Sequence, residues 1–215
     1  MKERPILFSG EMVRAILAGR KTQTRRVVNF KRLTKCRHGR LFFSETFNSW
    51  AIDSGDANAI ELVDCPYGAI GDQLWVRECW WHYKTAELEM AAFPGYTVTK
   101  LANGSHGEES KIEGWTPVDY DIYRKRPSIH MPRWASRISL EITNVRLEVL
   151  DAISEADAKA EGVEPSGKVE LKDGSPCYSA AFRELWTRIN GIDNPAAWER
   201  NPHVWVVEFK RVANQ

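Results

Sequence analysis

Lys21 and Thr24, three positions apart, are the residues of this chain best suited to covalent chemistry. A threonine hydroxyl is a poor nucleophile unless a neighbouring base removes its proton, and a desolvated lysine with a lowered pKa can be that base. Residues three apart face opposite sides of a regular strand, but they come together in a helical turn or a bulge. Cooperation between them therefore predicts an irregular backbone between Arg20 and Thr24, which Gly19 makes easy to form.

Positive charge surrounds this pair. Ten Lys or Arg residues and no Asp or Glu lie between Arg14 and Arg40, although the whole chain has a formal net charge of only +1. One basic segment on an otherwise acidic chain favours a localised anionic ligand over indiscriminate coating of nucleic acid. Arg25 and Arg26 are then candidates to polarise an acyl oxygen or to bind ribose or phosphate. A solvated basic loop is the plainer interpretation.

A second basic tract runs from Arg124 to Arg137 and contains two prolines. An arginine beside an aromatic ring in an extended loop can hold a phosphate and a base together, so Arg133 and Trp134 are candidate substrate-binding residues. The same tract can instead be a proline-rich lid that docks its apolar side chains on the core. Tyr67 and Trp75 are further candidates for stacking on a base.

Three helices are predicted to position these residues. Apolar spacing and end signals give their ranges as residues 10–18, with Ser9 as N-cap; 154–161, with Ser154 as N-cap and Gly162 as the stop; and 178–189, ending at Gly191. The last helix is expected to bury one face, made of Phe182, Leu185, Trp186 and Ile189.

Strands are predicted by alternation and β-propensity at residues 22–28, 40–45, 73–78, 137–150 and 203–209. Residues 84–118 contain several glycines and few periodic apolar positions, so they predict a long, partly irregular insertion, with a short helix near Ala86 to Ala92 as one option. No strands alternate regularly with crossover helices, and the fold class is therefore α+β. The length favours a single domain, 1–215, that carries this insertion.

Composition limits the remaining classes. The sequence has no apolar run of about 18 residues and no secretory leader. The four cysteines are unpaired by spacing, which is typical of free thiols in a reducing compartment, so we expect a cytoplasmic protein without membrane association. Cys36 with His38, and Cys79 with His82, have the short spacing of zinc ligands, and Cys65 would complete such a site. Neither pair forms a CxxC knuckle, and no metal or other cofactor is expected.

The segment Gly19-x-Lys21-x-x-x-x-Arg26 resembles the GxKxxxxR signature of the ASCH superfamily, whose members adopt a PUA-like β-barrel. Gly71-Asp72 resembles the turn of that family into a barrel strand, and Val204 to Lys210 resembles its terminal strand. Together with Ile129 to Ala135, the chain is similar to the ASCH proteins of bacteriophages and prophages. The resemblance implies a PUA-like mixed β-barrel with flanking short helices.

The resemblance also implies a function. PUA-like domains bind RNA, and the N4-acetylcytidine amidohydrolases within this superfamily share Leu-Ala-Gly-Arg-Lys-Thr-x-Thr with residues 17–24. Carried over, their lysine is Lys21, their nucleophilic threonine is Thr24, and their glutamate is Glu161, with Gly19 and Arg20 beside the substrate. The implied reaction is hydrolysis of an N-acylated pyrimidine nucleoside in the cytoplasm of a bacterial or phage-infected cell.

A carboxylate beside Lys21 favours its charged form and opposes its use as a base, unless Glu161 and Lys21 share a proton. Two other functions remain open at this point. One is an RNA-binding or RNA-processing module without amidohydrolase activity, whose ligand is RNA rather than a nucleoside. The other is a phage accessory protein that acts through protein contacts at residues 84–118, for which no partner is indicated.

Overall fold

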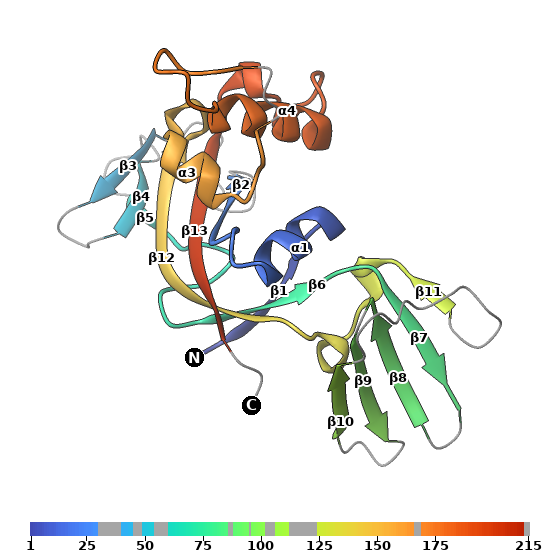
Figure 1. Ribbon diagram of the computed structural model, residues 1–215. Helices are drawn as coiled ribbons and strands as arrows, with labels where there is room; N and C mark the ends of the chain where they lie inside the picture. The colour runs from blue at the N-terminus through green and yellow to red at the C-terminus, as the bar shows by residue number, and fades with distance from the viewer. Residues whose placement is uncertain are drawn as a thin grey trace. The chain divides into compact units, whose positions relative to one another are not determined.

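The computed structural model describes residues 1–29, 40–44, 49–53, 60–85, 88–94, 96–101, 106–111, 124–165 and 169–212 (Figure 1). The chain divides into two compact units, each made of segments that are not contiguous in sequence. Unit 1 comprises Met1–Leu17, Gln73–Glu141 and Arg211–Gln215, and unit 2 comprises Ala18–Asp72 and Ile142–Lys210. The prediction of a single domain stays a prediction.

The central sheet has the strand order β1-β6-β12-β13-β2. Its strands are β1 (Glu3–Leu7), β6 (Gln73–Arg77), β12 (Ser139–Val149), β13 (His203–Val212) and β2 (Gln23–Val27). β1 and β6 are parallel, whereas β6 with β12 and β13 with β2 are antiparallel. Two of the boundaries between the units fall inside strands, between Glu141 and Ile142 in β12 and between Lys210 and Arg211 in β13.

Helices accompany this sheet, and the predicted α+β class is confirmed. In the strand order, β1 and β2 are the two edges, so the strands that the structure describes form an open sheet. The expected closed barrel is therefore not found among them. The PUA-like assignment stays a prediction.

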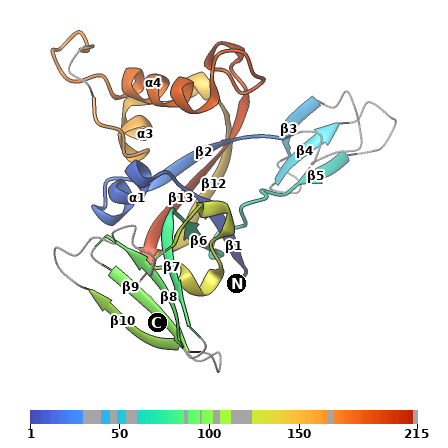
Figure 2. The ribbon, with the colours of Figure 1, turned by 90° about the vertical axis from the view of Figure 1, so that its right-hand side faces the viewer.

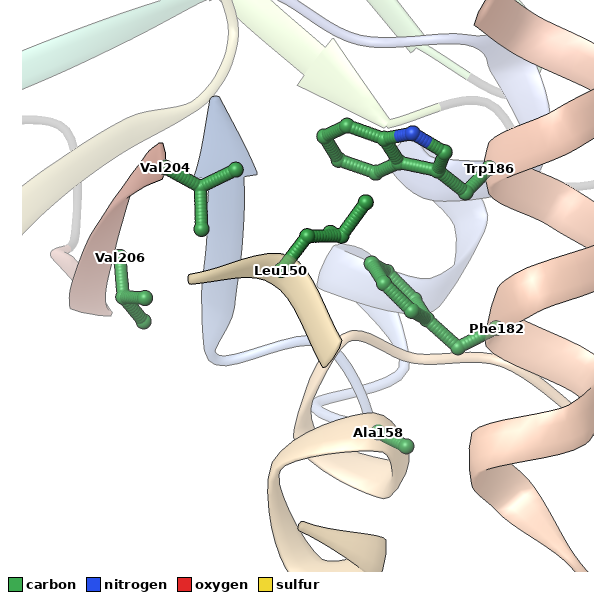
Figure 3. Packing of buried hydrophobic residues seen from close by; sticks show 6 residues of the cluster. All are labelled: Leu150, Ala158, Phe182, Trp186, Val204 and Val206. Atoms are coloured by element: carbon green, nitrogen blue, oxygen red, sulfur yellow. The ribbon is translucent and has the colours of Figure 1, made fainter. Parts of the chain in front are cut away.

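In unit 2, α3 (Glu155–Ala160) and α4 (Tyr178–Asn190) pack against β13 and against Leu150, the residue that follows β12 (Figure 2). Figure 3 shows the core that joins them, made of Leu150, Ala158, Phe182, Trp186, Val204 and Val206. Ser154 caps α3 as predicted, since its hydroxyl accepts a hydrogen bond from the Asp157 N–H at 3.1 Å. The predicted apolar face of α4 is correct at Phe182 and Trp186 but wrong at Ile189, which is 55% exposed.

In unit 1, α1 (Gly10–Leu17) lies where the sequence predicted it. A second, antiparallel sheet has the order β10-β9-β8-β7-β11. Its strands are β7 (Trp80–Lys84), β8 (Leu88–Phe93), β9 (Tyr96–Leu101), β10 (His106–Lys111) and β11 (Arg124–Arg126). Two single-turn helices follow, η1 (Ser128–His130) and η2 (Arg133–Ala135).

This second sheet corrects the prediction for residues 84–118. The option of a helix near Ala86 to Ala92 is wrong, because Leu88 to Phe93 pair with β7 on one side and with β9 on the other. Ala, Met, Leu and Glu are good helix formers, but the two-sided pairing outweighs that weak preference. The core of the sheet consists of Trp80, Ala91, Phe93, Met131 and Ala135.

A third sheet in unit 2 has three antiparallel strands, β3 (Arg40–Ser44), β4 (Ser49–Asp53) and β5 (Ile60–Val63). The strand predicted at residues 40–45 is confirmed in β3. The remaining single-turn helices are η3 (Leu150–Ala152) and η4 (Trp198–Arg200). Among the described helices, none is long and apolar enough to cross a membrane.

Candidate functional site

Strand β2 aligns its side chains with α3 in unit 2. The Thr22 N–H donates to the Ala160 carbonyl at 2.8 Å, and Lys21 forms a single antiparallel bridge with Glu161 at the end of that helix. The Gln23 amide donates to the Asp157 carbonyl at 3.1 Å. Two segments that are remote in sequence therefore meet along the first residues of β2.

Lys21 and Glu161 form a buried ion pair, as the resemblance implied. The Lys21 Nζ lies 2.7 Å from Glu161 Oε2 and also donates to the Glu161 carbonyl at 2.9 Å. The side chains are 0% and 3% exposed. Burial lowers the pKa of Lys21 below its ordinary 10.5, and this effect exceeds the opposing attraction of Glu161. The pair thus combines a possible proton acceptor and a possible proton donor in one dry contact.

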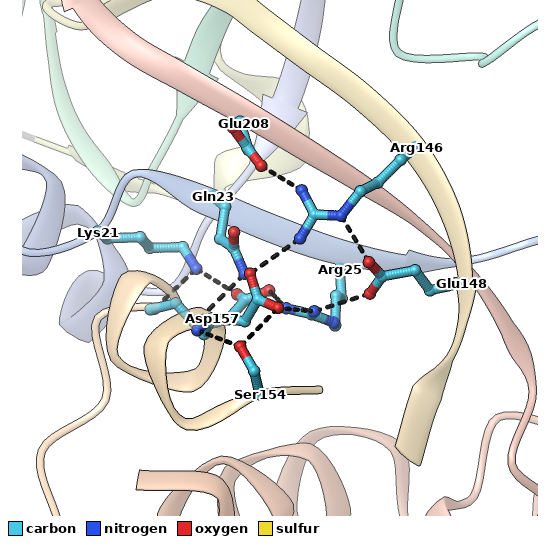
Figure 4. A network of polar contacts seen from close by, with 9 residues as sticks. Lys21, Gln23, Arg25, Arg146, Glu148, Ser154, Asp157 and Glu208 are labelled. Atoms are coloured by element: carbon cyan, nitrogen blue, oxygen red, sulfur yellow. Dashed lines mark hydrogen bonds and ion pairs between the residues drawn. The ribbon is translucent and has the colours of Figure 1, made fainter. Parts of the chain in front are cut away.

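Arg25 connects this pair to a larger network (Figure 4). Its guanidinium lies 3.4 Å from Glu161, 3.0 Å from Glu148 and 3.3 Å from Asp157. Arg146 extends the network to Glu148 at 2.5 Å, to Asp157 at 2.8 Å and to Glu208. The Arg25 side chain is fully buried and paired with carboxylates of the protein, so it is not exposed for the ligand contact that the sequence predicted.

Asp157 is held ionised in this network. Burial alone would raise the pKa of its carboxyl, but the Ser154 hydroxyl, Arg25 and Arg146 together lower it below its ordinary value. A carboxylate fixed in this way positions Arg25, and Arg25 in turn orients Glu161.

Sequence reasoning missed four members of the network: Arg146, Glu148, Asp157 and Glu208. Two signals were available in the sequence. Arg146 and Glu148 are two positions apart in a predicted strand and so share a face, while Asp157 and Glu161 are four apart on a predicted helix and so share a side. Neither signal shows which strand lies opposite.

Thr24 does not lie beside Lys21 in the way that the sequence predicted. From Thr22 onward the pairing of β2 with β13 is regular, with Thr24 opposite Val207 and the Phe209 N–H donating to Thr22. Side chains alternate along such a strand, so Thr24 lies on the face opposite Gln23 and Arg25, which contact α3 and its C-terminal cap. Gln23 and Thr24 lie in the regular part of β2, and Gly19, at φ 73°, lies before it, while the irregularity expected between Arg20 and Thr22 stays a prediction.

The face of β2 that carries Thr24 also carries Arg26, with Trp205 opposite it on β13. Thr24 and Trp205 are each 2% exposed, and the Trp205 indole nitrogen has no hydrogen-bond partner. Burial lowers the pKa of Arg26, while attraction to Tyr67 and then to Glu161 opposes that shift. The predicted residues Arg26 and Tyr67 therefore lie within electrostatic range of each other.

Arg20 covers the end of the site. Its guanidinium forms an exposed ion pair with Glu164 at 2.7 Å and lies 3.5 Å from the Gly162 carbonyl. It therefore links the turn before β2 to the turn after α3.

The other predicted binding residues belong to unit 1 and have partners there. Trp75 stacks with Arg77, whose guanidinium carbon is 4.8 Å from the ring centroid. Arg133 donates to both carboxylate oxygens of Glu3, at 2.8 and 3.0 Å. Trp134 packs edge-on against Trp80 in the core, as the lid interpretation expected, whereas Ile129 of the same tract is 57% exposed.

Cys36 and His38 lie outside the described residues, and within the described ranges no group of three or more His, Cys, Asp or Glu is placed to hold a metal ion. No family model, no curated protein and no solved structure matches the chain.

Proposed function

We propose that this protein hydrolyses N-acylated pyrimidine nucleosides of the N4-acetylcytidine type, with Lys21 and Glu161 as the proton-transfer pair. The observation that carries the proposal is the buried contact of 2.7 Å between Lys21 Nζ and the Glu161 carboxylate. Burial favours the amine form of Lys21, and an amine in contact with the Glu161 carboxylate can accept a proton and pass it to that carboxylate.

The pair supplies what amide hydrolysis needs. Lys21 removes a proton from water, and the water oxygen forms a bond to the acyl carbon. Lys21 passes this proton to Glu161, and the bond from the acyl carbon to N4 breaks as Glu161 delivers the proton to the departing amine. The products are a carboxylic acid and the free nucleoside, and both side chains return to their starting state.

Water is the nucleophile in this proposal because Thr24 lies on the opposite face of its strand. Thr24 is 2% exposed, and its side chain is part of the buried interior.

Substrate has to displace the cover of the pair, since the Lys21 side chain has no exposed surface. The turns on the two sides contain Gly19 and Gly162 in the left-handed region, at φ 73° and 79°. The exposed ion pair of Arg20 with Glu164 joins these turns, and exposed pairs of this kind contribute only about 0 to 1 kcal/mol. We therefore expect the cover to open at these two turns.

Release of cytidine and acetate from N4-acetylcytidine tests the proposal. We expect turnover by the unaltered protein and a loss of about 100-fold or more in kcat for Glu161→Gln, as for removal of an acid-base catalyst. Because single changes leave a buried charge unpaired, the double variant Lys21→Met/Glu161→Met separates catalysis from folding: it should fold and be inactive. Lys172→Met, at an exposed lysine, is the matched control.

Thr24→Ala should keep at least a tenth of the activity if water is the nucleophile. Complete loss of activity in a folded Thr24→Ala protein would show that the threonine, and not water, is the nucleophile. Absence of turnover in the unaltered protein would reject the hydrolase and leave the alternative of RNA binding without hydrolysis.

We further infer membership of the ASCH superfamily with its PUA-like fold, and a cytoplasmic location. The placement of Gly19, Lys21 and Arg26 around β2 supports the first, as does Gly71, at φ 87°, in the turn before β6. The three cysteines among the described residues are free, which is typical of a reducing compartment.

A further inference from the structure

The Glu161 carboxylate contacts two basic side chains. Lys21 Nζ lies 2.7 Å from Glu161 Oε2, and the Arg25 guanidinium lies 3.4 Å from Glu161 Oε1. The two carboxylate oxygens are thus divided between Lys21 and Arg25. Both basic side chains are 0% exposed and the carboxylate is 3% exposed, so solvent does little to stabilise the charge of Glu161.

This division affects the charge state in which the pair can begin a reaction. The proposed hydrolysis starts from Lys21 as an amine and Glu161 as a carboxylate. An amine no longer compensates the negative charge of Glu161, and a buried carboxylate without a cation is costly. Arg25 can supply the missing compensation, because a guanidinium keeps its proton throughout the physiological pH range.

Contacts with three elements hold Arg25 in place (Figure 4). Its guanidinium lies 3.0 Å from Glu148 on β12 and 3.3 Å from Asp157 on α3. Arg146 contacts the same two carboxylates, at 2.5 and 2.8 Å. The guanidinium carbon of Arg25 also lies 6.0 Å from the ring centroid of Phe182 on α4. The positive charge beside Glu161 is therefore fixed in position.

We propose that Arg25 is a positioning residue that serves as the counterion of Glu161, so that Lys21 can act as the base. This inference rests on the proposed hydrolysis and gives Arg25 a role that acts through Glu161 rather than through ligand. Arg146 supports that role through the two carboxylates that it shares with Arg25. The charge of Arg25 also opposes protonation of Lys21, which favours the same starting state.

The sign of each neighbouring charge makes this role testable. Among the described residues, the charged groups around Glu161 are Lys21 before β2, Arg25 and Arg26 on β2, Asp157 on α3, Glu148 on β12 and the exposed Arg20 near the following turn. Loss of a positive neighbour should favour protonation of Lys21, and loss of a negative neighbour should oppose it. Damage to the fold would not produce this opposition of sign.

Titration of Lys21 in the full chain measures the effect whether or not hydrolysis occurs. Lysine labelled with carbon-13 at Cε reports its protonation by NMR, and the spectrum of Lys21→Met identifies the signal. Arg25→Met should move the titration midpoint of Lys21 to higher pH, because a nearby positive charge is lost.

Two variants at partly exposed side chains keep the test decisive if Arg25→Met does not fold. Arg146→Met removes the support of Arg25 and should also move the Lys21 midpoint to higher pH. Asp157→Asn removes a negative charge 3.3 Å from Arg25 and should move the midpoint to lower pH. Arg200→Met, at an exposed arginine outside the network, is the control and should leave the midpoint unchanged.

The pH profile of N4-acetylcytidine hydrolysis gives a second measurement. The kcat should rise with pH as Lys21 loses its proton. In Arg25→Met this rise should move to higher pH, so that kcat at neutral pH falls by about tenfold or more. Arg25→Lys returns a positive charge and should restore most of that loss.

An unchanged Lys21 midpoint in folded Arg25→Met, or in Arg146→Met if the former does not fold, would overturn the role of Arg25. Shifts of Arg146→Met and Asp157→Asn in the same direction would also overturn it, because they would indicate a general loosening of the network. Expected shifts without hydrolysis by the unaltered protein would reject the hydrolase alone and support Arg25 as the counterion.

Discussion

At the scale of single residues, the pairing of Lys21 with Glu161 could be predicted only through the family resemblance. Local pattern shows that Lys21 follows a helix and that Glu161 ends one, but it does not show that the two residues meet. Their contact depends on β2 reaching the end of α3, which is a property of the tertiary fold. The cooperation of Lys21 with Thr24 failed for a local reason, because the strand is regular from Thr22 onward.

Burial of Lys21 has a consequence for stability at high pH. The pKa of Lys21 is lowered in the folded protein. Between that lowered pKa and 10.5, the unfolded chain therefore binds more protons than the folded protein. The contribution of Lys21 to the free energy of unfolding is therefore fully present above pH 10.5 and is lost as the pH falls from there toward the folded pKa. Lys21→Met should remove this dependence, and the unaltered protein should gain more stability than the variant as the pH rises from neutral toward 10.5.

Urea unfolding followed by tryptophan fluorescence at several pH values measures this difference. Lys172→Met, which removes an exposed lysine, should show the same pH slope as the unaltered protein. Identical slopes for Lys21→Met and the unaltered protein would contradict the lowered pKa.

At the scale of elements, helices with clear end signals were predicted well, and the inserted strands were not. Ser154, Gly162 and Gly191 gave the ends of α3 and α4 to within one or two residues. Residues 88–93 have no comparable signal, because their composition suits a helix and only pairing with two neighbours makes them a strand. Caps act locally, whereas strand pairing is a property of distant segments.

The cap of α3 should be important for the whole network. Ser154 accepts from the Asp157 N–H and donates to the Asp157 carboxylate at 2.9 Å. Ser154→Ala removes both contacts, and we expect it to lower the free energy of unfolding by about 1 to 2 kcal/mol. Ser9→Ala is the matched control at α1, where the corresponding contact is longer, 3.4 Å, and the loss should be smaller. Equal losses in the free energy of unfolding for the two variants would show that the Asp157 contacts add no stability beyond that of the cap at Ser9.

At the scale of the whole molecule, the second sheet is inserted into a hairpin. Strands β6 and β12 pair directly, Trp75 opposite Ser139, and the chain between them builds β7 to β11. The two ends of the insert are held together by Arg137, which donates to both carboxylate oxygens of Glu78 at 2.8 and 2.9 Å. The predicted insertion of residues 84–118 is thus the middle of a longer segment between Glu78 and Arg137, whose two ends are joined by this ion pair.

An insert of this kind should be removable. Replacing residues 79–136 by a short Gly-Ser linker leaves β6 and β12 as a simple hairpin, so the remaining chain should fold and keep any activity at Lys21. Circular dichroism, urea unfolding and the hydrolysis assay measure the result, and loss of cooperative unfolding in the shortened chain would show that the insert is needed for the fold.

The distance in sequence between Lys21 and its partner also affects how the protein is made. Glu161 is 140 positions after Lys21, so at about 5 to 20 residues per second the lysine leaves the ribosome on the order of ten seconds before its carboxylate. Until then Lys21 and Arg25 have to stay in water, because burying them unpaired is costly. A chain that stops before Glu161 cannot close this part of unit 2, and the network therefore distinguishes complete chains from truncated ones.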